Sequence, residues 1–225
     1  MSIQLHTVIR RRAASVKSRA EMTARKRMIL LCRIALAVAA PALADDGVVG
    51  IWSSVSRTKG GLGHQLVFTE KGTCTYTFGA VVDFKYEIHD DRIKMTLLQS
   101  NTNEVSTEQF LLGGDTLTLN PKTPESKQVM KRAGKPYQGT HPIVGDWTYA
   151  HYTGGIALMR YSRTGLVQLT VPASSLDGTY RIDHDSIVIE MQNQKPTRAK
   201  FKQNGNSLIL IDGKNREDKY VRFDY

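Results

Sequence analysis

The chain has 225 residues and a formal charge of +10, but residues 1–44 alone hold nine Lys or Arg residues and one acidic residue. The rest of the chain holds 22 basic and 20 acidic residues, so the charge gives no indication of nucleic-acid binding. Of the two cysteines only Cys74 lies after residue 44, which excludes an intramolecular disulfide in that part.

Residues 1–44 have the pattern of an export signal. Three consecutive basic residues precede the apolar stretch Met28–Ala40, and the small residues Ala42 and Ala44 follow it. This order of basic, apolar and small-residue regions predicts a secretory signal that is cleaved near Ala44. We therefore expect an exported protein that is periplasmic or secreted.

Two other interpretations of this leader stay open, an uncleaved anchor and an Arg-rich organellar transit peptide. The apolar stretch is shorter than the ~20 residues that a spanning helix needs. No other segment approaches that length, so we expect no stable transmembrane segment in the mature chain. The leader is long for a signal, and translation could start at Met1, Met22 or Met28.

After residue 45 the chain alternates apolar and polar residues, which is typical of strands with one buried face. In one such run Cys74, Tyr76 and Phe78 share a face and threonines occupy the other. Gly, Asn and Asp separate the runs at short intervals, so consecutive strands are expected to be antiparallel neighbours. The strands predicted in the first half are 49–56, 64–69, 73–79, 83–89, 92–98, 105–112, 116–120 and 127–132.

The landmarks of the first half return in the same order in the second half. The pairs are Gly50 and Gly145, Trp52 and Trp147, Gly72 and Gly165, Tyr86 and Tyr180, and Leu117 and Leu208. A period this long indicates a duplicated domain rather than a solenoid, whose repeats are usually ~20–50 residues long. We predict a first unit at 45–133, a linker at 134–142 and a second unit at 143–225.

A meander with one apolar face must close or stack to bury that face and its edges. The predicted fold is therefore all-β, with two tandem antiparallel meander barrels of about eight short strands each, after an N-terminal signal segment.

The Gly-x-Trp motif opens the first strand of each meander, at Gly50 and Trp52 and again at Gly145 and Trp147. This pattern resembles the lipocalin-like superfamily, and more closely the short lipocalin-like domains of bacterial exported proteins. The resemblance covers nearly all of 48–225.

In lipocalins a basic residue of the last strand packs over the first-strand tryptophan and closes one end of the barrel. The resemblance implies that Arg222 covers Trp147 through a cation–π contact. In the first unit Lys131 takes this place and Arg132 lies next to it, so the assignment stays open between these two residues.

Inward-facing aromatic and methionine side chains suit a pocket for an apolar ligand, and they suit a solid core equally well. The candidates for lining a pocket are Tyr76, Phe78, Phe84, Tyr86, Met95, Met159, Tyr161, Tyr180 and Met191.

Little in the sequence points to catalysis. His89 and His184 lie in equivalent hairpin turns but are not aligned with each other, and Cys74 corresponds to Val167, which indicates a small buried residue. No inward pair of carboxylates is apparent. We therefore predict no catalytic residue, no cofactor and no metal site.

Two functions remain. The first is an exported, non-catalytic protein that binds a small apolar or amphiphilic ligand inside one or both barrels. The second is an envelope protein–protein interaction module, an assembly factor or an inhibitor, with solid barrel cores.

Overall fold

The computed structural model describes residues 47–98, 104–136, 138–139 and 141–225. Within these ranges the chain forms fourteen strands and no helix, so the prediction of an all-β chain is confirmed. The same ranges contain no helix with the length and apolar character needed to cross a membrane. The predicted signal segment, residues 1–44, lies outside the described residues.

The strands are listed here in chain order. They are β1 (Gly50–Ser54), β2 (Leu62–Phe68), β3 (Thr73–His89), β4 (Arg92–Leu97), β5 (Val105–Gly113), β6 (Thr116–Leu119), β7 (Gln128–Ala133), β8 (Gly145–Ala150), β9 (Ile156–Tyr161), β10 (Leu166–Asp183), β11 (Ser186–Met191), β12 (Thr197–Asn204), β13 (Ser207–Ile211) and β14 (Glu217–Phe223).

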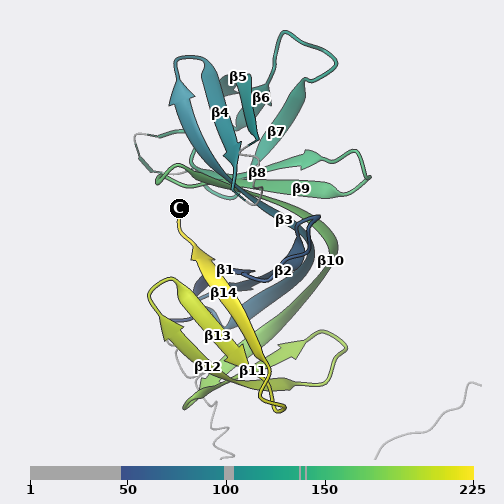
Figure 1. Cartoon of the computed structure of the whole chain (residues 1–225), viewed down its shortest axis with the longest axis vertical. Helices are drawn as coiled ribbons and strands as arrows, with labels where there is room; N and C mark the ends of the chain where they lie inside the picture. Colours follow the sequence, from purple (N-terminus) through teal and green to yellow (C-terminus); the bar gives the residue numbers. More distant parts are fainter. Residues whose placement is uncertain (1–46, 99–103, 137, 140) are drawn as a thin grey trace, which may run out of the picture. The chain divides into compact units, whose positions relative to one another are not determined.

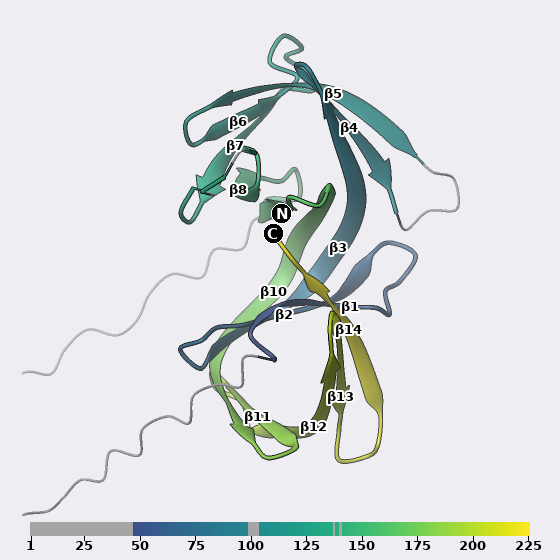
Figure 2. The ribbon, with the colours of Figure 1, turned by 90° about the vertical axis from the view of Figure 1, so that its left-hand side faces the viewer.

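The sheet is a closed antiparallel ring with one additional pair of strands that connects opposite sides of the ring, and we call this pair the crossing. Each strand pairs with its neighbours in sequence, and β14 pairs with β1. The long strands β3 and β10 also pair with each other, from Leu166 opposite Lys85 to Thr179 opposite Thr73. Figures 1 and 2 show these two strands side by side, with β4–β9 at one end of the pair and β1, β2 and β11–β14 at the other. The crossing thus divides the ring into two circuits of strands.

We name the circuits by their place in the chain. The central lobe consists of the described residues between 80 and 172, which include the second half of β3, the strands β4–β9 and the first half of β10. The terminal lobe consists of β1, β2, β11–β14 and the other halves of the two long strands. Each lobe has its own apolar core, one around Trp147 and the other around Trp52.

The predicted strands 73–79 and 83–89 are in fact a single strand, β3. The expected turn between them is missing, because Gly79 and the residues after it continue in an extended conformation. The equivalent segment of the second repeat is also continuous, as β10, with a bulge between Pro172 and Ser174. A bulge is one of the few places where a sheet accepts proline, which has no N–H to donate.

Because these two turns are missing, the repeats exchange their N-terminal hairpins. The first repeat's β1 and β2 complete a circuit with β11–β14 of the second repeat, while β8 and β9 complete one with β4–β7. The strand pairing therefore differs from the expected arrangement, in which 45–133 and 143–225 each close on themselves. The ring is formed jointly by both repeats, as in an intramolecular domain swap.

Equivalent contacts of the two repeats show this exchange directly. The backbone carbonyl of Gly72 accepts a hydrogen bond from Tyr180 N at 2.8 Å, and that of Gly165 accepts one from Tyr86 N at 2.7 Å. The phenol groups repeat the pattern, since Tyr180 donates to the carbonyl of Thr69 and Tyr86 donates to that of Ser162. Each of these contacts joins one repeat to the other.

The backbone conformation explains why the Gly-x-Trp motif begins with glycine. Gly50 has φ of 140° and Gly145 has φ of 122°, values that residues with a side chain rarely adopt. A Cβ at Gly145 would also lie 3.2 Å from the guanidinium of Arg132. Both glycines let the chain turn into the first strand directly before the buried tryptophan.

Candidate functional site

The two tryptophans occupy equivalent, fully buried positions. Trp52 and Trp147 are both 0% exposed. Each indole N–H donates a 2.7 Å hydrogen bond to the carbonyl four residues earlier, that of Val48 in one case and Ile143 in the other. This satisfies the only polar atom of each ring, so the residue acts as a core anchor.

An arginine lies over each tryptophan, but the pairs cross between repeats. The guanidinium of Arg222 lies 4.5 Å from the ring centre of Trp52, and that of Arg132 lies 4.0 Å from that of Trp147. The predicted contact between Arg222 and Trp147 is therefore wrong, because the exchanged hairpin places Trp52 next to β14. Lys131 makes no such contact: it is exposed and donates to the hydroxyl of Thr116.

The nine residues predicted to line a pocket are divided between the lobes. The central lobe contains Phe84, Tyr86, Met95, Met159 and Tyr161, and the terminal lobe contains Tyr76, Phe78, Tyr180 and Met191. In the central lobe, Tyr86 and Tyr161 pack edge to face with centroids 5.2 Å apart and are buried in the core. Phe84, Met95 and Met159 lie at the surface of a cavity.

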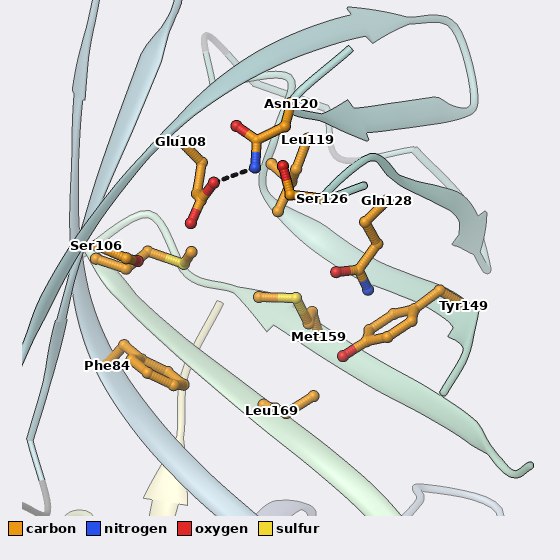
Figure 3. Close-up of a pocket in the computed structure, with 11 residues that line it drawn as sticks. Phe84, Ser106, Glu108, Leu119, Asn120, Ser126, Gln128, Tyr149, Met159 and Leu169 are labelled. Carbon is orange, nitrogen blue, oxygen red and sulfur yellow. Dashed lines mark hydrogen bonds between the residues drawn. The ribbon is translucent and has the colours of Figure 1, made fainter. Parts of the chain in front are cut away.

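This cavity has a volume of about 380 Å³ and lies within the central lobe (Figure 3). Its apolar lining comes from β3, β4, β6, β9 and β10 and consists of Phe84, Met95, Leu119, Met159 and Leu169. Its polar lining is contributed by β5, by β8 and by the segment from the end of β6 to β7, and consists of Ser106, Glu108, Asn120, Ser126, Gln128 and Tyr149. The cavity therefore has an apolar part and a polar part, as ligand sites commonly do.

The polar part combines a carboxylate with an amide donor. Glu108 accepts a hydrogen bond from the side-chain amide of Asn120. Gln128 Nε2 is buried and has no hydrogen-bond partner among the described residues. Figure 3 places Glu108 and Asn120 on one side of the cavity and Gln128 and Tyr149 on another. A buried donor without an acceptor is costly, which makes Gln128 Nε2 a candidate donor to a group that enters the cavity.

Sequence reasoning missed these polar residues, although one signal was present. Phe110 and Leu112 pack against the core from β5, and Glu108 precedes them on the same face of the strand at a spacing of two. An inward-facing carboxylate was therefore predictable from the alternation. Gln128 and Tyr149 gave no comparable signal, because their positions depend on the pairing of β6, β7 and β8.

The terminal lobe has different residues at the equivalent positions. Glu108 pairs with Ile93, and the equivalent residue Ile187 pairs with Ala199, so alanine takes the place of the carboxylate. In this lobe the hydroxyl of Tyr76 forms a 2.5 Å hydrogen bond with Nδ1 of His64. The His64 ring also packs against Phe78, with ring centroids 5.3 Å apart. Ring contacts of this kind stabilise the end of an aromatic core.

A second polar cluster lies where the two exchanged hairpins meet β10. Gln65 donates to Gln168 at 2.6 Å and accepts from Arg160 at 2.7 Å, while Gln168 donates to Asp83 at 2.7 Å. Gln65, Arg160 and Gln168 are all at most 6% exposed. Because both side-chain amides donate and accept, this cluster positions the strands of the crossing and leaves its amide groups bonded internally.

The cysteine and histidine considered as reactive groups occupy a core position and a turn position, respectively. Burial, followed by the negative charge of Asp177, raises the pKa of the Cys74 thiol to about 11, so the thiol stays protonated at neutral pH. His184 and Asp90 occupy the equivalent turn position, with φ of 58° and 52°. In the described ranges of the chain, no group of three or more His, Cys, Asp or Glu side chains could hold a metal ion.

Alkaline pH is expected to destabilise the protein. Burial raises the pKa of Tyr86, Tyr161, Tyr180 and Tyr220 above the ordinary value of 10.0, and these side chains are at most 8% exposed. A raised pKa in the folded state means that stability is complete below pH 10 and falls as the pH rises above it. We expect a loss of about 1 kcal/mol at pH 11 for each of Tyr161 and Tyr220, whose pKa values are raised most, and a further loss from Tyr86 and Tyr180. Urea unfolding at pH 8 and pH 11 measures this difference.

Two phenylalanine variants test the origin of this loss. Tyr161→Phe should reduce this loss, because phenylalanine has no hydroxyl to ionise. The substitution should otherwise be tolerated, since the Tyr161 hydroxyl has only a 4.0 Å contact with the sulfur of Met159. Tyr152→Phe is the control, since Tyr152 is 93% exposed, and should leave the loss unchanged. Equal stability of the wild-type protein at both pH values would contradict the prediction.

Comparisons with family models, with curated proteins and with solved structures found no match to this chain.

Proposed function

We propose that the protein is an exported, non-catalytic binding protein for a small amphiphilic ligand, which occupies the cavity of the central lobe. The observation that carries this proposal is the lining of that cavity, where the apolar side chains of Phe84, Met159 and Leu169 occur together with the polar side chains of Glu108 and Gln128. The volume of about 380 Å³ falls within the usual range of ligand sites, ~300–1,000 Å³.

The proposal keeps the lipocalin-like relationship and the two-barrel interpretation. Each circuit of the ring buries a tryptophan under an arginine, in agreement with a barrel that is closed at one end. In this interpretation each barrel takes strands from both repeats, and the tryptophan and arginine of each pair act as its end cap. Export to the periplasm or the medium, with cleavage near Ala44, belongs to the same proposal.

A neutral fluorescent probe, 1-N-phenylnaphthylamine, tests ligand uptake. We expect the full chain to bind it, with increased fluorescence, because apolar surface leaves water in a site that is already formed. Leu169→Trp fills the cavity and should weaken binding about tenfold or more. Leu111→Trp is the matched control, because Leu111 is 61% exposed and lies in β5 of the same lobe outside the cavity lining.

Equal binding by the Leu169→Trp variant would show that the probe occupies another part of the molecule. Absence of any binding would favour a second candidate function, an envelope protein–protein interaction module. That candidate is supported by a hollow of about 210 Å³ at the crossing of the ring, lined by Leu98, Leu166 and Val221, which are 42–51% exposed. Apolar side chains that gather on a surface commonly mark a contact with another protein.

A further inference from the structure

We propose that the central cavity selects a ligand with a protonated amine and, separated from it, a hydrogen-bond acceptor, both carried on an apolar body. This inference rests on the proposed function and specifies the class of ligand for the same site. It follows from two polar side chains of the cavity. Among the described residues, Glu108 carries a negative charge without an ion pair, and Gln128 has an amide donor without an acceptor.

Glu108 provides the negative charge. Its side chain extends from β5 into the cavity, where one carboxylate oxygen accepts a bond from Asn120 (Figure 3). Among the residues that the structure describes, no Lys, Arg or His forms an ion pair with Glu108. An amide stabilises a carboxylate but does not neutralise it, so a cation entering the cavity gains an attraction that a neutral group lacks.

Gln128 provides the donor that an acceptor must meet. Its Nε2 has no hydrogen-bond partner among the described residues and is covered in the empty cavity, so the side chain must rotate for this donor to meet a ligand. Ser126, Gln128 and Tyr149 also border a second hollow, of about 530 Å³, which is lined by the start of β7, the end of β8 and the residues next to them. These residues therefore lie at the rim of the cavity, where the polar end of a ligand can reach them while its apolar end contacts Met159 and Leu169.

The terminal lobe provides an internal comparison. Ala199 replaces Glu108 at the equivalent position of β12. The fold therefore tolerates a residue without a carboxylate here, and the charge in the central lobe is not a requirement of strand pairing. Selection for a cation is accordingly a property of one lobe.

The test uses four probes of similar size and isothermal titration calorimetry on the full chain. The probes are 3-phenoxypropylamine, 3-phenoxypropan-1-ol, 4-phenoxybutanoate and 4-phenylbutylamine. We expect 3-phenoxypropylamine to bind at least about tenfold more tightly than the alcohol, and the carboxylate to bind most weakly. Replacing its ether oxygen by a methylene, as in 4-phenylbutylamine, should also weaken binding.

Variants assign these preferences to residues. Glu108→Gln and Glu108→Ala should weaken amine binding about tenfold and leave alcohol binding within about twofold. Gln128→Leu should remove the advantage of 3-phenoxypropylamine over 4-phenylbutylamine. Glu190→Gln removes the same charge from an exposed position of β11 and should change nothing. Thermal unfolding of each variant confirms that it is folded.

The outcomes separate the two proposals. If the wild-type chain binds the alcohol or the carboxylate as tightly as the amine, the ligand class proposed here is overturned, whereas the cavity remains a binding site. If none of the probes binds and the neutral fluorescent probe also fails, the proposed function itself is overturned. Unchanged selectivity in both Glu108 variants would also overturn the role given to this carboxylate.

Discussion

Replacing Trp52 or Trp147 by alanine is expected to lower the free energy of unfolding by about 3–5 kcal/mol in each case. Both side chains are completely buried, and each substitution leaves a large cavity and an unpaired carbonyl, that of Val48 or that of Ile143. The measurement is urea or thermal unfolding followed by circular dichroism. Melting like that of the wild type in both variants would contradict the burial of these side chains.

A double-mutant cycle then tests the exchange of hairpins. Arg222→Leu should show a coupling energy of about 0.5–2 kcal/mol with Trp52→Ala, because the guanidinium lies 4.5 Å from that ring. It should show no coupling with Trp147→Ala beyond about 0.5 kcal/mol, the usual limit for distant sites. The opposite result would mean that each repeat closes on itself and that the pairing of β1 with β14 is wrong.

Gly79→Val is expected to destabilise the chain by about 3 kcal/mol or more. A Cβ at Gly79 would lie 2.2 Å from the backbone carbonyl oxygen of Val171 and 2.9 Å from the amide nitrogen of Ala173. Neither atom belongs to a flexible side chain, so β3 and β10 must separate locally. The free energy of unfolding in urea measures this effect.

Gly113→Val is the matched control for this substitution. A Cβ at Gly113, at the end of β5, meets nothing within 4 Å, and the change should stay within about 0.5 kcal/mol of the wild type. If Gly79→Val were as stable as this control, β3 and β10 could not be paired in the register observed.

The class of fold was predictable because alternation of apolar residues reports directly on strands with one buried face. The pairing between repeats was not predictable, for a physical reason. Residues such as Tyr86 and Tyr180 occupy equivalent positions, so Gly165 can bond to either one with the same geometry. A self-closed repeat and an exchanged one therefore use nearly the same contacts, and only the turn expected after Gly79 distinguishes them.

The candidate site was predictable in part. Phe84, Met95 and Met159 were expected to line a pocket, and all three line the cavity of the central lobe. A search for functional residues that are present in both repeats discards every residue that differs between them. Glu108 is discarded in this way, because its counterpart is Ala199. In a duplicated chain whose two lobes have diverged, a difference between repeats marks a site as readily as an agreement does.

The insertion of one lobe into the other has a consequence for how the chain folds as it is synthesised. All the strands of the central lobe, residues 80–172, emerge from the ribosome before β11, so this half can close early. The strand β1 must wait for β14, nearly the full length of the chain, before its second edge is covered. Until then an unpaired edge is exposed, and chaperone binding to nascent chains is expected to concentrate on β1 and β2.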